Sequence, residues 1–549
     1  MRIVLDIETN LFPDKIWCVV ARDIDTNQVH IWQNFVGLQN FLDRAEQIIA
    51  HNGIFFDVPV LKNLWKITIA EEKIVDTLVM SRLYNPQLDG GHSLSEWGKR
   101  IGFFKSSFES FNGGLTQEML DYCIQDTLVT QKLYEHLTKE MSNDYSKESI
   151  KLEHEVAFII AEQERSGFRF DEAKALQLLS VLKTKLDAIC VEMQSIFPAK
   201  VTSGRTHKTT GRPLPDIVED FNPGSRQQIA ERLIEKGWKP KKRTQKGNII
   251  VDETTLEGID IPEAKAIAEY LMLQKRIAQV ESWIDAIQTD GRVHGQVITN
   301  GAVTGRMTHH SPNMAQVPNS GSPYGPDCRE LWTVKKGYKL VGIDASGLEL
   351  RMLAHYMKDD AYTNEVVSGD IHTTNQKAAG LETRNQAKTF IYAFLYGAGA
   401  TKIGSIVGGS SKEGQALIAS FLRNTPRLKQ LREKVSRIYA QKAWLPGLDG
   451  RKLLVRSEHS ALNTLLQGAG AIAMKQALVI FNKRLRQSQI DYKFVANVHD
   501  EWQIEVEENR ADEVGKLGVQ SITDAGIILN MRCPLSGEYR VGNNWKETH

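Results

Sequence analysis

The stretch Val341-Gly-Ile-Asp-Ala-Ser-Gly-Leu-Glu-Leu-Arg-Met-Leu353 constrains the fold of this chain more than any other. Its apolar beginning predicts a strand over residues 340–343 that ends at the carboxylate of Asp344. Ser346 and Gly347 then turn the chain, and the apolar residues of 348–353 fall at helical spacing. A carboxylate after a buried strand is most often a helix cap, so this pattern alone leaves the function open.

A second stretch supplies a partner for that carboxylate. Phe494-Val-Ala-Asn-Val-His-Asp-Glu-Trp-Gln-Ile-Glu505 predicts a hairpin with His499, Asp500 and Glu501 at its tip. Two carboxylates on neighbouring strands can hold a pair of Mg²⁺ ions, because Mg²⁺ prefers hard oxygen ligands and leaves coordination positions open for phosphates. The two stretches together therefore favour phosphoryl-transfer chemistry.

These stretches resemble motifs A and C of the family A DNA polymerases, in which Asp344 and Asp500 match the metal-binding aspartates. The segment Arg384-Asn-Gln-Ala-Lys-Thr-Phe-Ile-Tyr-Ala-Phe-Leu-Tyr-Gly397 resembles motif B of the same family. The resemblance covers nearly the whole chain and is closest to the phage replicative branch, which is typified by thioredoxin-dependent enzymes.

Motif B carries four functional side chains at a constant interval. Arg384, Lys388, Tyr392 and Tyr396 recur every four residues, so each lies about 40° beyond a full helical turn from the last. Two cations followed by two phenols on one drifting face suit a triphosphate that lies beside a sugar and a base. Core packing alone would explain the aromatic residues equally well, but it does not explain the two cations in line with them.

Acidic residues near the N-terminus form a second pattern. A short strand over residues 1–5 leads to Asp6 and Glu8, which share a strand face because they are two apart. The stretch His51-Asn-Gly-Ile-Phe-Phe-Asp57 adds Asp57, and Tyr122-Cys-Ile-Gln-Asp126 places its first and last residues on one helix face. Any one of these acids alone would more often be a surface residue or a cap.

Type, order and spacing agree at all three places, and together they resemble the exonuclease motifs of the DnaQ-like proofreading domain. In that family the carboxylates hold two metal ions and the tyrosine helps to orient the attacking water. All four acids, Asp6, Glu8, Asp57 and Asp126, are present with Tyr122, so the domain is expected to be active. Asp76 is expected to be a supporting residue.

The resemblance implies an α/β multidomain fold, with an RNase H-like exonuclease domain followed by a right-hand polymerase domain of thumb, palm and fingers. The expected domains are the exonuclease over 1–145, the thumb over 146–290, the palm over 291–356 and 463–549, and the fingers over 357–462. In the thumb, apolar stripes at helical spacing predict long amphipathic helices, one through Leu152 to Ile160 and one through Leu176 to Met193. A basic run over 239–246 is a candidate for phosphate contacts, although such runs are usually solvated loops.

The resemblance also assigns roles to single residues. Two Mg²⁺ ions are expected at Asp344, Asp500 and the backbone carbonyl of Ala345, and two more at Asp6, Glu8, Asp57 and Asp126. Arg384, Lys388 and His372 are expected to bind the triphosphate, with Lys388 as the acid for the leaving group. Glu349 and Tyr392 would exclude a ribose 2′-hydroxyl, and Tyr396 would stack beside the templating position. Arg306, Gln467 and His499 are expected to contact the DNA near the primer end, and Glu501 to support the metal site.

Composition excludes little. The formal net charge of +1, from 68 basic and 67 acidic residues, does not indicate nucleic-acid binding. The five cysteines contain no CxxC pair, which disfavours a zinc site or a disulfide framework and fits reduced thiols. No apolar run suggests a signal peptide or a membrane span, so the expected location is the cytoplasm, for a phage enzyme that of a bacterial host.

Three alternatives stay open at this point. The chain could be a nuclease whose polymerase half only grips DNA, a structural nucleic-acid-binding protein, or an RNA polymerase of related palm architecture. The expected partners of a polymerase are primer–template DNA and dNTPs, with a helicase–primase and a single-strand-binding protein as further candidates. The protein is expected to act as a monomer.

One segment departs from the phage branch. Thioredoxin-dependent polymerases of this type carry a long basic insertion in the thumb, between a Gly-x-Pro-Leu-Pro segment and an Asn-Pro-x-Ser segment. Here Gly211-Arg-Pro-Leu-Pro215 is followed after five residues by Phe221-Asn-Pro-Gly-Ser225. The intervening Asp-Ile-Val-Glu-Asp is too short for a docking module and is net acidic. Thioredoxin binding is therefore not expected.

Overall fold

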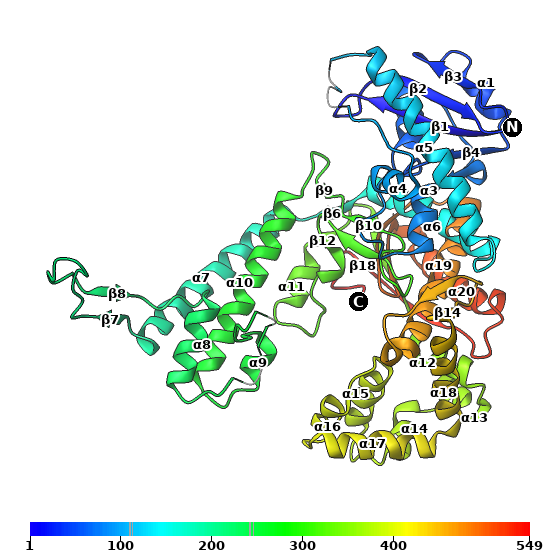
Figure 1. Cartoon of the computed structure of the whole chain (residues 1–549). Helices are drawn as coiled ribbons and strands as arrows, with labels where there is room; N and C mark the ends of the chain where they lie inside the picture. Colours follow the sequence, from blue (N-terminus) through cyan, green and yellow to red (C-terminus); the bar gives the residue numbers. More distant parts are fainter. Residues whose placement is uncertain (109–110, 112, 241–242, 245) are drawn as a thin grey trace. The chain divides into compact units, whose positions relative to one another are not determined.

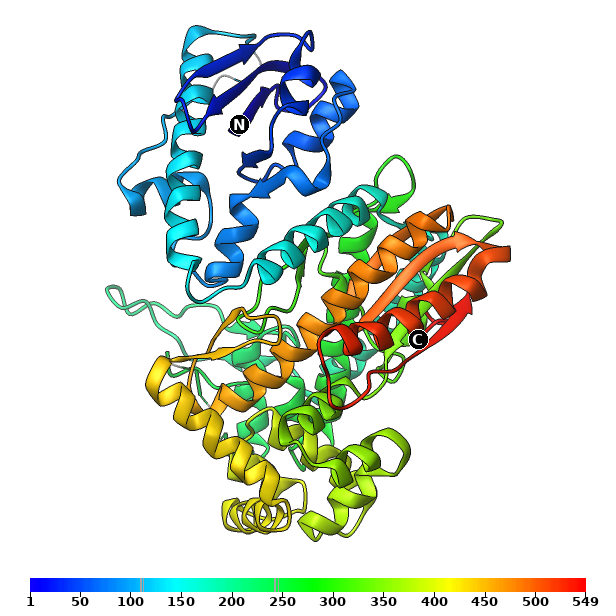
Figure 2. The same cartoon turned by 90° about the vertical axis from the view of Figure 1, so that its right-hand side faces the viewer.

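The computed structural model describes residues 1–108, 111, 113–240, 243–244 and 246–549. The chain forms two compact units (Figures 1 and 2). The first unit consists of Met1–Phe168, Gly295–Gln316 and Val334–His549, and the second of Arg169–His294 and Val317–Thr333. Both helices and sheets occur in the first unit, and the predicted α/β multidomain class is confirmed.

A five-stranded mixed sheet opens the first unit. Its strands lie in the order β3-β2-β1-β4-β5 and are β1 (Arg2–Thr9), β2 (Ile16–Asp23), β3 (Val29–Trp32), β4 (Gln47–Ala50) and β5 (Ile74–Asp76). β1 to β3 pair antiparallel, whereas β4 is parallel to β1 and to β5. The alternating Ile3, Leu5 and Ile7 of β1 are buried in one core, which leaves Asp6 and Glu8 on the opposite strand face.

Helices follow and cover this sheet. They are α1 (Leu38–Asp43), α2 (Asp57–Trp65), α3 (Thr77–Tyr84), α4 (Leu94–Ile101) and α5 (Gln117–Met141), with a 3₁₀ turn at Glu71–Lys73. α5 begins at Thr116, whose side chain caps the helix by accepting from the N–H of Met119. The helix packs against β1 and β2, with Cys123 buried beside Cys18 and Val20. This packing brings Tyr122 and Asp126 toward the end of β1.

A four-stranded antiparallel sheet forms the second core of the first unit. Its order is β16-β17-β13-β18, with β13 (Tyr338–Ala345), β16 (Tyr492–Val498), β17 (Glu501–Glu507) and β18 (Gly537–Gly542). The predicted strand and hairpin are therefore confirmed as elements, although β13 begins before residue 340 and Glu501 already lies in β17. Gly347 has φ +59°, a left-handed conformation that glycine adopts without strain, and it starts α12 (Leu348–Met357).

Long helices pack on this second sheet. α20 (Ala511–Ile528) lies against β13 and β18, and α19 (Ala461–Gln487) packs on α20, α12 and α6 (Lys147–Ser166). By length and composition, Glu458–Gln487 is the one candidate membrane span among the described residues, with mean hydropathy 1.3 over an 18-residue window. Because 78% of that window is buried, α19 is better explained as a core helix. The expectation that no segment approaches a membrane span is corrected to this extent.

A helical segment follows α12. It contains α13 (Asp360–Ser368), α14 (Ile371–Ala379), α15 (Arg384–Leu395), α16 (Ala400–Ser405), α17 (Ser411–Asn424) and α18 (Pro426–Lys442). α15, the motif B helix, starts with a capping box between Thr383 and Gln386. Its buried face, which includes Phe390 and Phe394, packs against Phe421 of α17. The four predicted functional side chains lie outside this buried face. Arg384, Lys388 and Tyr392 belong to α15, and Tyr396 lies just past its end.

Short elements complete the first unit. They are β10 (Gln296–Ile298) paired with β11 (Thr308–His310), β14 (Trp444–Pro446) paired with β15 (Lys452–Leu454), and 3₁₀ turns at Met314–Gln316, Glu458–Ser460 and Glu508–Arg510. α6 also belongs to this unit, although residues 146–290 are predicted as thumb. Its stripe from Leu152 to Ile160 is buried in the same core as α19 and the four-stranded sheet, which explains the difference.

The second unit is mainly helical. α7 (Glu172–Ile196) and α10 (Glu263–Asp285) pack along each other, and α8 (Arg226–Glu235), α9 (Glu253–Glu257) and α11 (Gly325–Glu330) are shorter. Two small sheets are formed by β7 (Lys200–Thr202) with β8 (Ile217–Glu219), and by β6 (Phe168–Phe170) between β9 (Arg292–Val293) and β12 (Trp332–Thr333).

The second unit differs from the sequence predictions at two places. In the stripe predicted from Leu176 to Met193, Leu176 is 51% exposed. The buried residues of α7 are Ala175, Leu182, Ile189 and Met193. Residues 317–333, predicted as palm, belong to this unit, since Trp332 packs against Phe170 and Trp283. In the basic run over 239–246, residues 241, 242 and 245 lie outside the described part of the chain.

Candidate active sites

The first candidate site lies where β13 and the β16–β17 turn meet. Asp344 pairs in register with Glu501, and the N–H of Ala345 donates to the backbone oxygen of Asp500 over 3.2 Å. Burial raises the pKa of Asp344 to about 7, and the carboxylates of Asp500 and Glu501 add to the shift. The pKa of Asp500 is also raised, first by burial and then by Glu349. Partly buried carboxylates that repel one another in this way are stabilised by a cation.

Glu501 differs from these two aspartates because its carboxylate is already bound by protein groups. Trp545 Nε1 donates to Glu501 Oε1 over 2.6 Å, and His549 Nδ1 lies 2.6 Å from Oε2. Gln503 donates as well. Burial alone would raise the pKa of Glu501, but these partners hold it below its ordinary value. Glu501 is therefore fixed as an anion beside the aspartates.

Sequence reasoning missed this role of residues 543–549. The sequence gives little indication of it, because chain ends often fray. The side chain of Trp545 is 1% exposed, and Thr548 Oγ1 donates to Gln503 Oε1 over 2.8 Å. The only signal in the sequence is a buried-type residue, Trp545, close to the end.

A polar group connects the first site to the motif B helix. Glu349 Oε1 accepts from the phenol of Tyr396 over 3.1 Å and lies 3.3 Å from Nη2 of Arg306. Arg306 in turn lines one small cavity together with His499 and Asp500. The structure thus brings these predicted residues together. Gln467 is half-buried on α19, one turn before Gly470 of the same cavity wall.

The exposed face of α15 carries the remaining predicted residues. The rings of Tyr392 and Tyr396 stack with centroids 6.5 Å apart, and His372 of α14 lies 6.3 Å from the ring of Tyr392. Burial lowers the pKa of His372, and the positive charges of Arg384 and Lys388 add to the shift. Burial, followed by Glu349, raises the pKa of Tyr392.

Arg384 has a partner that the sequence did not predict. Its guanidinium Nε lies 2.9 Å from Asp370 Oδ2, on the exposed surface. Exposed ion pairs of this kind contribute little, because water screens both charges. An incoming phosphate can therefore replace Asp370 at little cost.

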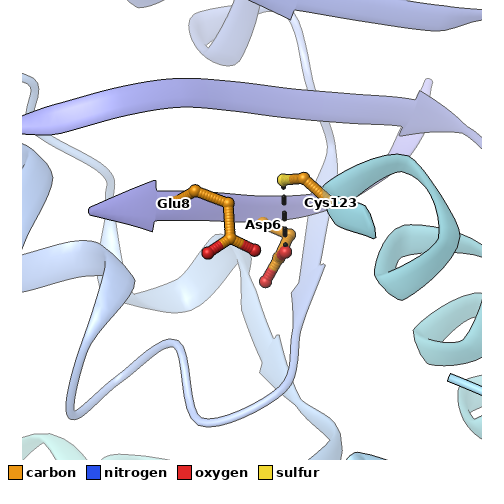
Figure 3. Close-up of side chains that lie close together, drawn as sticks. All are labelled: Asp6, Glu8 and Cys123. Carbon is orange, nitrogen blue, oxygen red and sulfur yellow. Dashed lines mark hydrogen bonds between the residues drawn. The ribbon is translucent and has the colours of Figure 1, made fainter. Parts of the chain in front are cut away.

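The second candidate site lies at the end of β1. Asp6 and Glu8 project to the same side of the strand, and Cys123 of α5 lies beside Asp6 (Figure 3). Burial raises the pKa of Asp6 to about 7 with Asp126 adding to it, and burial followed by Asp6 raises the pKa of Glu8 to about 9. The pKa of Asp57 lies well above its ordinary value because of burial and then Asp6. The four predicted carboxylates therefore converge.

Two observations show that this second site fits divalent cations. Asp126 Oδ1 is buried and has no hydrogen-bond partner among the described residues. Asp6, Glu8 and Cys123 each offer a ligand atom, and these atoms lie within 4.8 Å of one another. Burying several carboxylates without a counter-charge costs several kcal/mol, which a bound cation would offset.

Lys105 is a residue of this second site that sequence reasoning missed. Its ammonium pairs with Asp126 Oδ2 and lies 4.6 Å from the ring centroid of Tyr122. Lys105 belongs to the loop between α4 and α5, where its position carries no periodic signal. Burial raises the pKa of Asp126, and Lys105 opposes that shift.

Asp76 holds the backbone that leads to the second site. Its carboxylate accepts from the N–H groups of Asn52 (2.9 Å), Ile54 (3.1 Å) and Leu78 (2.9 Å). It thereby orders the turn that leads to Asp57 and caps α3.

An antiparallel sheet that presents partly buried aspartates at a strand end, beside a helix that carries two cations, is typical of a metal-dependent phosphoryl-transfer enzyme. The family model described as DNA polymerase family A matches residues 202–547. The chain is 34% identical to the DNA-directed DNA polymerases of Enterobacteria phage T3 and Escherichia phage T7, and each alignment covers 100% of both chains. The chain belongs to DNA polymerase family A and is a template-directed DNA polymerase, and family A polymerases use Mg²⁺.

A solved structure shares the fold. The polymerase domain of Pol1 from M. smegmatis, in complex with DNA primer-template and dNTP, matches 100% of this chain and 96% of that chain. The TM-score is 0.83 at 18% sequence identity, so this likeness concerns the fold.

Proposed function

We propose that this polymerase extends primers at the first site and removes misinserted nucleotides at the second, by 3′–5′ exonuclease action of residues 1–145. The observation that carries the proposal is the presence of two separate carboxylate clusters, one at the partly buried Asp344 and Asp500 and one around the partly buried Asp6. Each cluster would hold two Mg²⁺ ions.

At the polymerase site, Asp344, Asp500 and the backbone carbonyl of Ala345 would hold the ions. Bound Mg²⁺ supplies charge neutralisation for the triphosphate and makes the primer 3′-hydroxyl more acidic. Glu501, fixed by Trp545 and His549, keeps a negative charge beside the aspartates.

The residues of α14 and α15 would bind the nucleotide. Arg384, Lys388 and His372 would bind the triphosphate, and Lys388 would donate a proton to the departing pyrophosphate. Glu349 and Tyr392 would close the space that a ribose 2′-hydroxyl needs, and Tyr396 would stack beside the templating base. The gathered basic groups around His372 support this assignment.

Near the primer end, Arg306 and Gln467 would donate to minor-groove acceptors and His499 would contact the primer terminus. The minor groove offers similar N3 and O2 acceptors on every correct base pair, so donors there check geometry without reading sequence. The cavity that Arg306 and His499 share with Asp500 supports this placement.

At the exonuclease site, Asp6, Glu8, Asp57 and Asp126 would hold the ions, and Tyr122 would orient the attacking water. Bound Mg²⁺ there supplies an activated water and stabilises the leaving 3′ oxygen. The unpartnered Asp126 Oδ1 supports this role. Lys105, which pairs with the other oxygen of Asp126, would contact the scissile phosphate.

The proposed substrates are primer–template DNA and dNTPs, and the protein would act as a monomer in the cytoplasm of a phage-infected bacterium. Thioredoxin would not bind. In support, residues 217–219 form β8, which pairs with β7 as a short hairpin. The alignments with the T3 and T7 enzymes run over 706 positions, 157 more than this chain has, so those relatives carry segments that it lacks.

Separate substitutions test the division between the two sites. Asp344→Ala should abolish primer extension and keep 3′–5′ degradation of single strands, and Asp6→Ala with Glu8→Ala should do the reverse. Asp216→Ala, at an exposed acid of the second unit, is the control and should keep both activities. Loss of both activities from either set, in protein that still unfolds cooperatively, would contradict the two-site proposal.

A primer-extension gel with and without Mg²⁺ and dNTPs separates the remaining alternatives. A nuclease that only grips DNA would shorten the primer and never lengthen it, and a structural binding protein would do neither. Preference for ribonucleotides would indicate an RNA polymerase.

A further inference from the structure

The exonuclease site contains a thiol among its carboxylates. Cys123 follows Tyr122 on α5, and its Sγ donates to Asp6 Oδ2 over 3.3 Å (Figure 3). One ligand atom each from Cys123, Asp6 and Glu8 lies within 4.8 Å of the others. The exonuclease chemistry proposed above uses the carboxylates and Tyr122, and it leaves the thiol without a function.

Contacts with neighbouring residues determine which ligand atoms of this site can bind a cation. Lys105 already pairs with Asp126, and Asp6 and Glu8 are the carboxylates whose oxygens lie within 4.8 Å of the Cys123 sulfur. Cys123 projects from α5 to the side of Asp6, and its side chain is fully buried. A first cation that enters the site would therefore meet two carboxylate oxygens and one sulfur.

This donor set favours a different ion from Mg²⁺. Mg²⁺ takes oxygen ligands in a near-ideal octahedron and gains little from sulfur, whereas Zn²⁺ and Cd²⁺ bind thiolate strongly. Ligand atoms around one tetrahedral Zn²⁺ stand about 3.3–3.8 Å apart, given bond lengths of about 2.0–2.3 Å. Side-chain shifts of about 1 Å would close the observed set around such an ion.

We propose that Asp6, Glu8 and Cys123 form a binding site for a thiophilic divalent cation, Zn²⁺ or Cd²⁺, which displaces Mg²⁺ and stops the exonuclease while the polymerase site continues. On binding, the S–H bond of Cys123 breaks, its proton leaves to solvent, and a sulfur–metal bond replaces the hydrogen bond to Asp6. No oxidation occurs. Ion binding follows from the geometry alone, and only the inhibition rests on the proposed exonuclease function.

The first experiment measures binding. Metal-free full-length protein is titrated with Cd²⁺, and the ultraviolet charge-transfer band of thiolate-bound Cd²⁺ is followed. The band should saturate at one ion per chain, and Cys123→Ser and Cys123→Ala should weaken Cd²⁺ binding at least tenfold, since loss of even an indirect ligand partner costs roughly 10–100-fold.

Two cysteine variants serve as controls. Cys18→Ser removes a buried thiol from the same interior, and Cys190→Ser removes a half-buried thiol in the second unit. Both should keep the band. An undiminished band in both Cys123 variants, or its loss in Cys18→Ser, would overturn the assignment of ligands.

The second experiment measures inhibition at constant Mg²⁺. At a dose that leaves primer extension unchanged, Zn²⁺ should suppress 3′–5′ degradation by the parent protein and by Cys190→Ser. Cys123→Ser should be resistant, which means that Zn²⁺ should leave its degradation rate close to the rate of the same variant without Zn²⁺. Equal sensitivity of Cys123→Ser and the parent would refute the inhibitory role. If the parent degrades no DNA with Mg²⁺ alone, the proposed exonuclease function fails, and the Cd²⁺ band still decides the ion site.

Discussion

Four buried charges join α6 to the rest of the first unit and allow a quantitative prediction. Lys475 Nζ donates to both oxygens of Glu153 over 2.7 and 2.9 Å. Arg451 donates to Glu153 and also to Asp449, over 2.7–3.0 Å for the latter. The side chains of Glu153, Arg451 and Lys475 are 0%, 1% and 3% exposed. Two cations and two anions make this charge network neutral.

The perturbation is to remove one charge and then its partner. Lys475→Met leaves a buried excess negative charge, and Glu153→Gln leaves a buried excess positive charge, so each should lower the free energy of unfolding by about 3–5 kcal/mol. The double variant is neutral again, because Arg451 keeps Asp449. It should be less destabilised than either single variant, which gives a coupling free energy of about 3 kcal/mol or more.

The assay is urea unfolding followed by tryptophan fluorescence, with far-ultraviolet circular dichroism as a check on the native state. Lys483→Met is a matched control, because Lys483 pairs with Glu155 across the same two helices over 2.8 Å, with the lysine side chain 57% exposed. Its loss should cost about 0–1 kcal/mol. If Lys475→Met costs no more than Lys483→Met, or if the double variant equals the sum of the singles, the reasoning from buried charge is wrong.

Three further predictions follow from the sites. Tyr392→Phe should restore discrimination against dideoxynucleotides by roughly several hundredfold, about 3–4 kcal/mol, because the phenol can replace a missing 3′-hydroxyl. The control Tyr396→Phe should not restore it. Equal chain termination by both variants and the parent in an extension gel would contradict this prediction. The pKa of Asp344 is raised to about 7, so in metal-free protein its contribution to stability is present below about pH 4 and is lost as the pH rises through 7. In urea unfolding, Asp344→Asn should therefore be more stable than the parent at about pH 8 and should lose that advantage near pH 4. Thioredoxin should not lengthen products made in one binding event with competitor DNA present, and added salt should shorten them steeply because the contacts are mainly to phosphates.

Local patterns in the sequence were sufficient for much of both sites. The alternation in β1 put Asp6 and Glu8 on one face, and the strand–turn pattern at Asp344 and the hairpin at Asp500 are both present. These predictions depend on periods of two and of about four residues, which short-range sterics enforce. The buried and exposed faces of α15 followed from the same argument.

What the sequence did not reveal depends on contacts between distant residues. Lys105 meets Asp126 through a loop, and Glu501 meets Trp545 and His549 through the docking of a chain end. Neither a loop lysine nor a residue near a terminus carries a periodic signal, so a sequence pattern cannot report its partner. The compact units also differ from the predicted domain boundaries, because apolar stripes show which face is buried and do not show against which element.

α6 shows why such distant contacts matter for a polymerase with two sites. Two consecutive residues of this helix contact groups that belong to the two sites. Glu153 accepts from Lys475, which lines the cavity beside Asp500. His154 Nε2 accepts from the N–H of Asp76 over 2.8 Å. Asp76 in turn orders the turn that carries Asp57. The helix that the sequence predicts as the start of a thumb is thus built into the core that positions both carboxylate clusters. Because neighbouring residues of a rigid helix cannot shift independently, a substitution that loosens Glu153 should disturb the exonuclease site as well as the polymerase site.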